Sequence, residues 1–245
     1  MAAFPLLMPA TKLPPKLIVF DLDKTLIAGN STVLWTEWLY EKGIVKDPIY
    51  RQINREMERD YAAGTLDIAA YERKQSGAFR RLDEATLTKL VSEFVKKRIA
   101  PLVYPEAKQW VKNAVSSGTP TYVLSASTSF LVAPVARMLF GIENAIGIEL
   151  ERVDGFFTGE IAGIPSYEEG KVERLQEVLA MHGFAFADVL FFTDSRTDLP
   201  LARAAGFTCC VNPDPVLLAE ARRSGWRVLK WELPLRTQIA LGQKA

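Results

Sequence analysis

Residues 17–26 read LIVFDLDKTL, an apolar run that two aspartates follow at once. An apolar run of this length is typical of a buried strand in a parallel sheet. Asp21 and Asp23 then lie where the strand ends, and the ligands of open α/β sheets bind at the carboxyl ends of strands. The two acids could also form an ordinary exposed turn, so their functional interpretation depends on the rest of the chain.

The composition is that of an ordinary globular protein. Of the 245 residues, 49% are hydrophobic and 24% are charged, which allows one large α/β domain or a core domain plus a smaller one. The net charge of +1 gives no sign of a nucleic-acid surface. No apolar run approaches the roughly 18 residues that span a bilayer. Prolines interrupt residues 1–15, which we expect to be a loosely ordered leader and not a signal peptide.

The few cysteines and the single histidine limit the cellular compartment and the kinds of catalytic site that the sequence allows. Cys209 and Cys210 are adjacent in an apolar run, where neighbouring strand side chains point to opposite faces, so we expect two reduced core residues. The single histidine, His182, precedes Gly183 and is interpreted as a helix end. One histidine excludes chemistry that needs a histidine pair, and no His–Cys zinc cluster has candidates. We therefore expect a cytoplasmic protein without nucleic-acid or membrane partners.

The pattern after the first strand is helical as far as about residue 100. Apolar residues recur at helical spacing over residues 34–39, and Gly43 and Gly64 supply helix ends. A short third helix follows, and a fourth is expected over residues 83–99. An all-helical block after a single strand predicts a separate small domain at residues 30–100.

Strands alternate with helices from residue 101 onward. Repeated βα units imply an α/β fold with a doubly wound, mostly parallel sheet and right-handed crossovers. The core domain would comprise residues 16–29 and 101–245. The expected strands of the sheet after the first are residues 121–124, 189–192, 207–211 and 227–229.

Two details of the core domain are also predicted. A hairpin turn at Asp154 and Gly155 would join strands at residues 146–151 and 156–161. A helix over residues 129–140 contains Pro134, which we expect near its first turn.

Polar side chains at the predicted strand ends and one helix start supply a set of groups for phosphate chemistry. Neighbouring carboxylates repel one another and need a cation, and oxygen ligands without thiolate or imidazole select Mg²⁺ over zinc. One carboxylate can attack phosphorus, and a second can protonate the leaving oxygen and activate water. A lysine and a hydroxyl can hold the phosphoryl oxygens. The candidates are Asp21, Asp23, Ser125, Lys171, Asp194 and Asp198.

The order of these motifs resembles the haloacid dehalogenase superfamily of aspartate-dependent phosphatases, in the branch that includes phosphoserine phosphatases. Its first motif, Asp-x-Asp-x-Thr, is matched at residues 21–25, and Ser125 and Lys171 match the second and third. Asp194 and Asp198 match the acidic fourth motif. The resemblance covers about residues 16–230. It implies a Rossmann-like core domain and a helical cap that closes over the substrate and excludes water.

The resemblance also implies a role for each matching residue. Asp21 would be the nucleophile and a Mg²⁺ ligand, and Asp23 would be the general acid and base and would bind the metal through its carbonyl. Asp194 would bind Mg²⁺ directly, while Asp198 would hold the metal shell or Lys171. Ser125 and Lys171 would grip the phosphate.

Three of these residues have structural alternatives. Ser125 could cap the following helix. Asp198 could be the N-cap of a helix that starts near residue 199, alone or together with its role in the site. Lys171 could be a solvated lysine at the start of a helix.

The residues expected to select the substrate depart from the resemblance. Phosphoserine phosphatases carry a glutamate nine residues after the nucleophile, where this chain has Asn30, and relatives often have Asn where this chain has Thr197. Arg51, Arg55 and Arg59 share one helix face, which is either a solvated stripe or a surface for a substrate anion, with Arg55 the first candidate.

The sequence therefore predicts a Mg²⁺-dependent phosphomonoesterase that acts on a small phosphorylated metabolite through an aspartyl-phosphate intermediate. Phosphoserine and histidinol phosphate are both candidate substrates. A phosphotransferase of the same fold and a non-catalytic phospho-ligand binding module are the alternatives.

Overall fold

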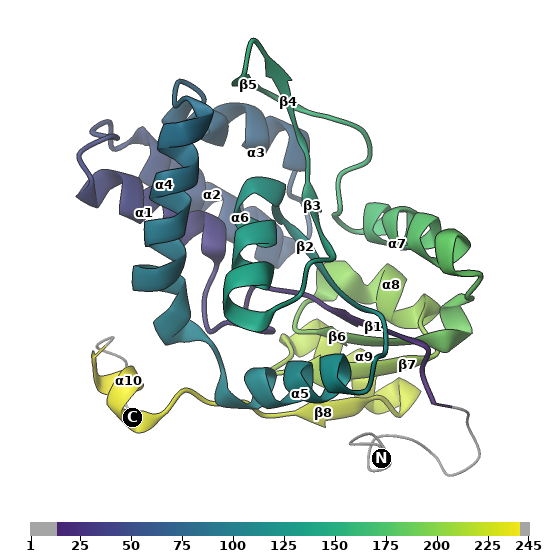
Figure 1. Ribbon diagram of the computed structural model, residues 1–245. Coiled ribbons are helices and arrows are strands. Elements are labelled where there is room, and N and C mark those ends of the chain that lie inside the picture. Colours follow the sequence, from purple (N-terminus) through teal and green to yellow (C-terminus); the bar gives the residue numbers. More distant parts are fainter. Residues whose placement is uncertain (1–13, 241–245) are drawn as a thin grey trace.

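The computed structural model describes residues 14–240 (Figure 1). Residues 1–13, which make up nearly all of the predicted leader, lie outside the described residues. No helix between residues 14 and 240 combines the length and the apolar character needed to cross a bilayer.

Six parallel strands form the central sheet, in the order β3-β2-β1-β6-β7-β8. The chain leaves β1 to pair β2 on one side and returns later to pair β6 on the other, so connections diverge at β1 as at the ligand-binding switch point of doubly wound sheets. The strands are β1 (Leu17–Phe20), β2 (Thr121–Thr128), β3 (Ala145–Ile148), β6 (Val189–Thr193), β7 (Phe207–Val211) and β8 (Arg227–Leu229).

Helices cover both faces of the sheet, because successive side chains of the fully buried β1 point to opposite faces. Phe20 belongs to the core cluster that includes residues of α5 (Pro105–Ser116) and α6 (Ser129–Val135). Val19 belongs to the cluster with α7 (Glu169–His182) and α8 (Leu199–Ala204). A smaller cluster joins Cys210 to α9 (Pro215–Ser224), and a last helix, α10 (Leu235–Ala240), follows β8.

The block between β1 and α5 is helical, as predicted. Its helices are α1 (Ser31–Glu41), α2 (Ile49–Ala63), α3 (Ile68–Gln75) and α4 (Glu84–Phe94), followed by the π-helical residues Val95–Ile99. Gly64 ends α2 with a left-handed φ of 71°, and Asn30, Asp67 and Asp83 cap the other three helices through their side chains.

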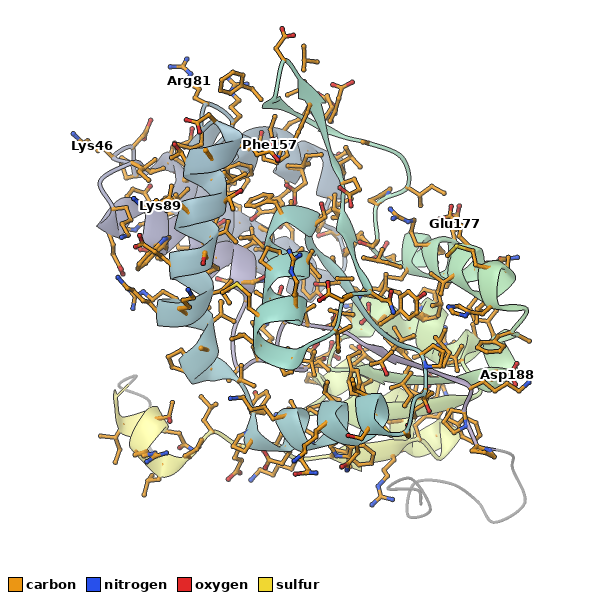
Figure 2. All side chains as sticks on the ribbon, in the orientation of Figure 1. Lys46, Arg81, Lys89, Phe157, Glu177 and Asp188 are labelled. Carbon is orange, nitrogen blue, oxygen red and sulfur yellow. The ribbon has the colours of Figure 1, made fainter. Side chains whose placement is uncertain are left out.

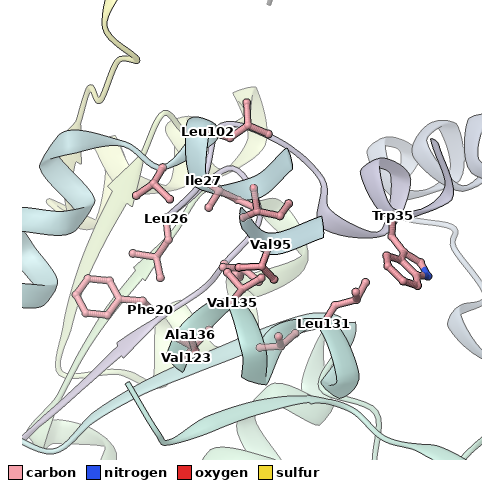
Figure 3. Packing of buried hydrophobic residues seen from close by; sticks show 14 of the residues in the cluster. Phe20, Leu26, Ile27, Trp35, Val95, Leu102, Val123, Leu131, Val135 and Ala136 are labelled. Carbon is pink, nitrogen blue, oxygen red and sulfur yellow. The ribbon is translucent and has the colours of Figure 1, made fainter. Parts of the chain in front are cut away.

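The core of the sheet continues into this block. Trp35 of α1 packs edge-on against Phe94 of α4, and both belong to the same cluster as Phe20 and Leu131 (Figure 3). The fully buried residues of α2 and α3 form a second, smaller cluster built on Met57, and Tyr50 and Ile68 link it to the main core. The helices α1 and α4 are thus anchored directly in the main core, while α2 and α3 reach it through partly buried residues.

Charged side chains cover the outer surface, as Figure 2 shows for Lys89 of α4 and Glu177 of α7. In the same view Phe157 lies near the junction of the helical block and the hairpin. Its ring meets the ring of Phe79 edge-on at 5.7 Å, which ties the hairpin to the block.

The hairpin differs from the prediction in one respect. Asp154 and Gly155 form its turn with φ of 51° and 83°, as a type I′ turn requires, which confirms that part. The single strand predicted at residues 146–151 is wrong, because the chain leaves the sheet after Ile148. Residues 150–153 form β4 (Leu150–Val153), which pairs antiparallel with β5 (Phe156–Ile161).

Two other element predictions need correction. Strand β2 extends to Thr128, so Ser125 lies within the strand and not after it. Pro134 is the sixth residue of α6, not part of its first turn, and the helix continues as the π-helical residues Ala136–Phe140. A proline inside a helix lacks the N–H and crowds the carbonyl four residues earlier, which accounts for the wider turn that follows.

The cysteines and the histidine lie as predicted. Cys209 and Cys210 are buried free thiols in different core clusters. His182 ends α7, and Gly183 follows it with a left-handed φ of 66°.

Candidate active site

The carboxyl ends of β1, β2 and β6 meet beneath the helical block. The backbone N–H of Asp21 donates to the Phe192 carbonyl at 2.9 Å, which places the residues that follow β1 and β6 side by side. A cavity of about 50 Å³ lies there. From the core it is lined by Asp21, Asp23, Lys24, Ser125, Ala126, Ser127, Tyr167 and Asp194, and from the block by Asn30, Thr32, Met57, Tyr61, Leu66, Ile68 and Tyr71.

Lys171 is buried and bridges two of the predicted acids. Its Nζ lies 2.8 Å from Asp21 Oδ1 and 2.7 Å from Asp198 Oδ1. Burial opposes the charge, but Asp198 and Asp21 outweigh it and raise the pKa of the Lys171 ammonium above its ordinary value. The solvated alternative for Lys171 is therefore wrong.

A close backbone contact positions Lys171 at the start of α7. Gly170 lies so near the Pro165 carbonyl that a Cβ would meet its oxygen at 1.9 Å, so only glycine fits. Residues 165–171 consequently fold tightly against the end of the sheet. This turn directs a lysine from a helix start into the interior.

Asp198 is the N-cap residue of α8 by position, but its side chain holds Lys171. Its side chain makes no capping hydrogen bond to α8, and Thr193 Oγ1 donates to its Oδ2 at 2.7 Å. Asp198 therefore stands at the predicted N-cap position without a side-chain cap, and its carboxylate makes the expected contact with Lys171.

Asp21 and Asp194 repel each other across the cavity. Burial raises the pKa of Asp21 to about 7, with Lys171 acting against the shift and Asp198 adding to it. Burial, then Asp21 and Asp198, raise the pKa of Asp194 well above its ordinary value. Thr25 Oγ1 donates to Asp194 Oδ1 at 3.3 Å. Two buried carboxylates with raised pKa values are a pair that a bound cation would stabilise in the ionised form.

The carboxylates of Asp21 and Asp194 fit Mg²⁺ better than a metal ion whose ligands all come from protein side chains. Among residues 14–240, no three histidine, cysteine or acidic side chains converge on a metal position. Mg²⁺ keeps several waters and is usually held by one or two carboxylates plus substrate phosphate. Asp21 and Asp194 could supply the carboxylates, and the Asp23 carbonyl a further oxygen.

Asp23 is held by the first residue of α1 and by β2. Its Oδ1 accepts from the Ser31 backbone N–H at 2.8 Å, and its Oδ2 accepts from Ser31 Oγ at 3.0 Å and Ser127 Oγ at 2.6 Å. Burial still raises the pKa of Asp23 above its ordinary value, although these three hydrogen bonds oppose the shift. The carboxyl is thus held in one orientation by donors from α1 and β2.

Ser125 lies on the cavity wall and does not cap a helix. It is buried, its Oγ accepts from the Ser127 N–H at 3.2 Å, and its carbonyl accepts from Ser166 Oγ at 2.6 Å. The N-cap of α6 is Thr128. The capping alternative is therefore wrong, and the Ser125 hydroxyl proton is available to a ligand.

Sequence reasoning missed Ser127 and Tyr61. Ser127 follows Ser125 by two residues on one strand, so the period of a strand puts both on one face, and this signal could have found it. Tyr61 reaches the cavity from α2, and its hydroxyl lies 2.7 Å from Thr197 Oγ1. Thr197 itself is not a lining residue, so it contacts the cavity through Tyr61.

The two other predicted substrate residues have different positions. Asn30 lines the cavity, but its Oδ1 accepts from the N–H groups of Thr32 and Val33 as the cap of α1. Arg55 is exposed and does not line the cavity. Its neighbours on that face, Arg51 and Arg59, pair with Glu37 and Asp60, so the arginine face matches the solvated alternative.

The wall that the helical block contributes is largely apolar and aromatic. Met57, Tyr61, Leu66, Ile68 and Tyr71 form it, and none of these five side chains carries a charge at neutral pH. The charged lining groups come from the core. The site thus has a charged floor, formed by the residues of the core domain, and an apolar roof, formed by these five residues of the helical block.

The haloacid dehalogenase-like hydrolase family model matches residues 18–203. The chain belongs to this family. The match runs from β1 into α8 and contains every lining residue of the cavity, and it confirms the resemblance drawn from the motifs.

Relatives of this hydrolase include named phosphatases. The histidinol-phosphatase of Neisseria meningitidis serogroup C is 37% identical over 220 residues, which are 88% of this chain and 99% of the relative. The phosphoserine phosphatase of Methanocaldococcus jannaschii is 25% identical, over 84% of this chain and 90% of the relative.

Solved structures of similar proteins have the same fold. A protein of unknown function from Bordetella pertussis Tohama I superposes with a TM-score of 0.80 at 32% identity, over 89% of this chain and 99% of that one. A phospho-aspartyl intermediate analogue of phosphoserine phosphatase superposes with a TM-score of 0.65 at 21% identity, over 95% of this chain and all of that one. The predicted α/β fold class is confirmed.

Proposed function

We propose that this haloacid dehalogenase-like hydrolase is a phosphomonoesterase that acts through an aspartyl-phosphate at Asp21. The observation that carries the proposal is the buried Lys171, which holds Asp21 Oδ1 at the floor of the cavity and is itself held by Asp198. A carboxylate fixed in this way is oriented for attack. The lysine beside it can also stabilise charge on the transferring phosphoryl group.

In the first step an Asp21 carboxylate oxygen attacks phosphorus and the bond from phosphorus to the ester oxygen breaks. Asp23 gives its proton to that leaving oxygen. Burial raises the pKa of Asp23 above its ordinary value, which favours proton transfer from this carboxyl, and the hydrogen bonds from Ser31 and Ser127 fix its orientation.

In the second step Asp23 takes a proton from water as the water oxygen attacks phosphorus. The bond between phosphorus and Asp21 breaks, which frees inorganic phosphate and restores both carboxyl groups. Ser125 Oγ and Lys171 Nζ would hold the non-bridging oxygens through both steps, where charge develops.

Asp21, Asp194 and the Asp23 carbonyl would hold Mg²⁺, which when bound neutralises phosphoryl charge and so favours attack by an anion. EDTA should abolish turnover and Mg²⁺ should restore it. Ca²⁺ should not, because it prefers more ligands and longer bonds.

We further propose that residues 30–100 act as a cap over the site. The cavity of about 50 Å³ is far below the roughly 300 Å³ of ordinary small-molecule sites, so entry of a metabolite requires the block to move. The helices α2 and α3 have a smaller second cluster and only partly buried residues against the main core, so they are the part of the block least tied to Trp35.

For the substrate, histidinol phosphate fits better than phosphoserine. Phosphoserine carries a carboxylate that needs a cation, and the lining residues of the helical block offer none. The imidazole of histidinol phosphate is a flat ring that can stack on Tyr61 or Tyr71. The 37% identity to a histidinol-phosphatase supports this choice.

The test is phosphate release by the purified full-length protein with Mg²⁺ from histidinol phosphate, phosphoserine and p-nitrophenyl phosphate. We expect the highest kcat/KM for histidinol phosphate and no release by Asp21→Asn. Absence of release from all three esters, and from a wider panel of metabolite phosphates, would overturn the proposed activity. A higher kcat/KM for phosphoserine would overturn the substrate assignment alone.

A further inference from the structure

Lys24 lies next to the catalytic acids in an unusual backbone conformation. Its φ is 60°, a left-handed value that is costly for residues with a Cβ, and its N–H donates to the Gly29 carbonyl at 3.1 Å. Non-glycine residues in this region concentrate at functional sites, where the surrounding structure holds them in place. The lysine side chain lines the same cavity as Asp21, Asp23 and Asp194.

The Lys24 side chain lies at the boundary between two hollows. Together with Asp194 it lines both the small cavity and a neighbouring groove of about 820 Å³ walled by Asn212 and Trp231. The side chain is exposed, and within residues 14–240 it forms no ion pair. Its ammonium can therefore stay hydrated until an anion enters.

The negative charge of the aspartates that line the cavity would be balanced better by a further cation. Lys171 is shared between Asp21 and Asp198, which leaves Asp23 and Asp194 without a lysine of their own. A phosphate dianion that enters this set adds two more negative charges, beyond what one divalent cation offsets. Among the residues that line the cavity, Lys24 is the one basic side chain, because Lys171 lies behind Asp21 and is not a lining residue. Its charge lowers the pKa values of Asp23 and Asp194, so it acts within the site.

We propose that Lys24 is a phosphate-binding residue, whose ammonium contacts the phosphoryl group of the substrate and the inorganic phosphate product. The inference rests on the proposed phosphatase function. It adds a cation from the loop after β1 to the Ser125 and Lys171 contacts. Because Lys24 meets the part that all phosphate esters share, it acts on every substrate alike and does not choose among them.

The direct test is the binding of inorganic phosphate, with Mg²⁺ present, measured by isothermal titration calorimetry on the full chain. The variant Lys24→Asn removes the charge and keeps a residue that tolerates left-handed φ. We expect its Kd for phosphate to rise about 10–100-fold, as for the loss of a charged hydrogen bond. Lys24→Arg should stay within about threefold of wild type. Lys24→Gly, which suits the backbone best, should match Lys24→Asn and guards against a folding artefact.

Steady-state kinetics with two esters distinguish a contact with the phosphoryl group from a contact with the alcohol part of the substrate. Lys24→Asn should lower kcat/KM by a similar factor for p-nitrophenyl phosphate and for histidinol phosphate. A Kd for phosphate within twofold of wild type in both neutral variants, or no phosphate binding by the wild type, overturns the inference. A kinetic loss confined to one ester overturns it as well. If wild type binds phosphate and hydrolyses no ester, the proposed function fails while the titration still decides the role of Lys24.

Discussion

Lys171 Nζ and Asp21 Oδ1 lie 2.8 Å apart, with both side chains shielded from solvent. The same ammonium lies 2.7 Å from Asp198 Oδ1. An isolated charge in such a place would be costly, so each member of this trio depends on the others. The trio is therefore both a structural element and the support of the proposed nucleophile.

Removal of Lys171 should destabilise the fold as well as abolish turnover. Lys171→Met leaves Asp21 and Asp198 buried without their cation, and loss of one partner of a buried pair costs about 3–5 kcal/mol. Urea denaturation measures the free energy of unfolding. Adding Asp198→Asn should recover part of the loss because it removes one stranded charge. A loss below about 1 kcal/mol in the single variant would contradict the dependence of the trio on Lys171.

Asp23→Asn should slow turnover in a way that depends on the leaving group. Loss of general acid and base help typically costs about 10²–10⁴-fold. In single-turnover assays the first step should suffer less with p-nitrophenyl phosphate, whose leaving group needs no proton, than with an alkyl phosphate ester. Equal losses for both esters would show that Asp23 does not protonate the leaving oxygen.

Glu72 of α3 should make stability fall as pH rises. It is 1% exposed, and burial raises the pKa of its carboxyl to about 8 from 4.5. Between these values the unfolded chain has lost a proton that the folded protein keeps, so the contribution of Glu72 to the free energy of unfolding declines. Glu72→Gln should exceed wild type by about 1–4 kcal/mol at pH 8 and equal it near pH 4.5.

The two forms of Glu72 can be compared by urea denaturation at both pH values. The difference between variant and wild type isolates this group from the other titrating residues. A difference that does not change with pH would contradict a neutral buried Glu72.

Substrate choice should depend on the buried face of α2 and not on its arginines. Arg55→Ala should leave kcat/KM within about twofold of wild type, since Arg55 is exposed away from the cavity. Met57→Ala, two residues further on the same helix, should change the ratio of kcat/KM for histidinol phosphate over p-nitrophenyl phosphate by about threefold or more, because Met57 lines the roof. Circular dichroism checks that both variants fold. A tenfold loss in Arg55→Ala would restore the arginine face as a substrate surface.

The sequence predicts the sheet and the helical block well, for a physical reason. Buried parallel strands are apolar runs, and glycines mark helix ends, so residues 17–20 and Gly64 are readable without tertiary information. The candidate acids Asp21 and Asp194 can also be predicted from the sequence, because each directly follows an apolar run that forms a buried strand.

What the sequence does not predict depends on how helices pack. Helix periodicity identifies a face of α2 but not what it faces, so Arg55 looks as eligible as Tyr61 and Met57. Asn30 has the residue type of a substrate contact, yet its side chain is used to cap α1. The split of the predicted strand between β3 and β4 likewise depends on which partner strand lies nearby.

The proposed mechanism requires that Asp21 becomes phosphorylated during turnover. The direct measurement is an acid-quenched reaction with substrate and Mg²⁺, digested and analysed by mass spectrometry. We predict one phosphoryl group on the peptide that carries Asp21, transient in wild type and absent in Asp21→Asn. A phosphoryl group on a different residue, or Asp21→Asn that keeps more than a tenth of wild-type turnover, would show that Asp21 is not the nucleophile.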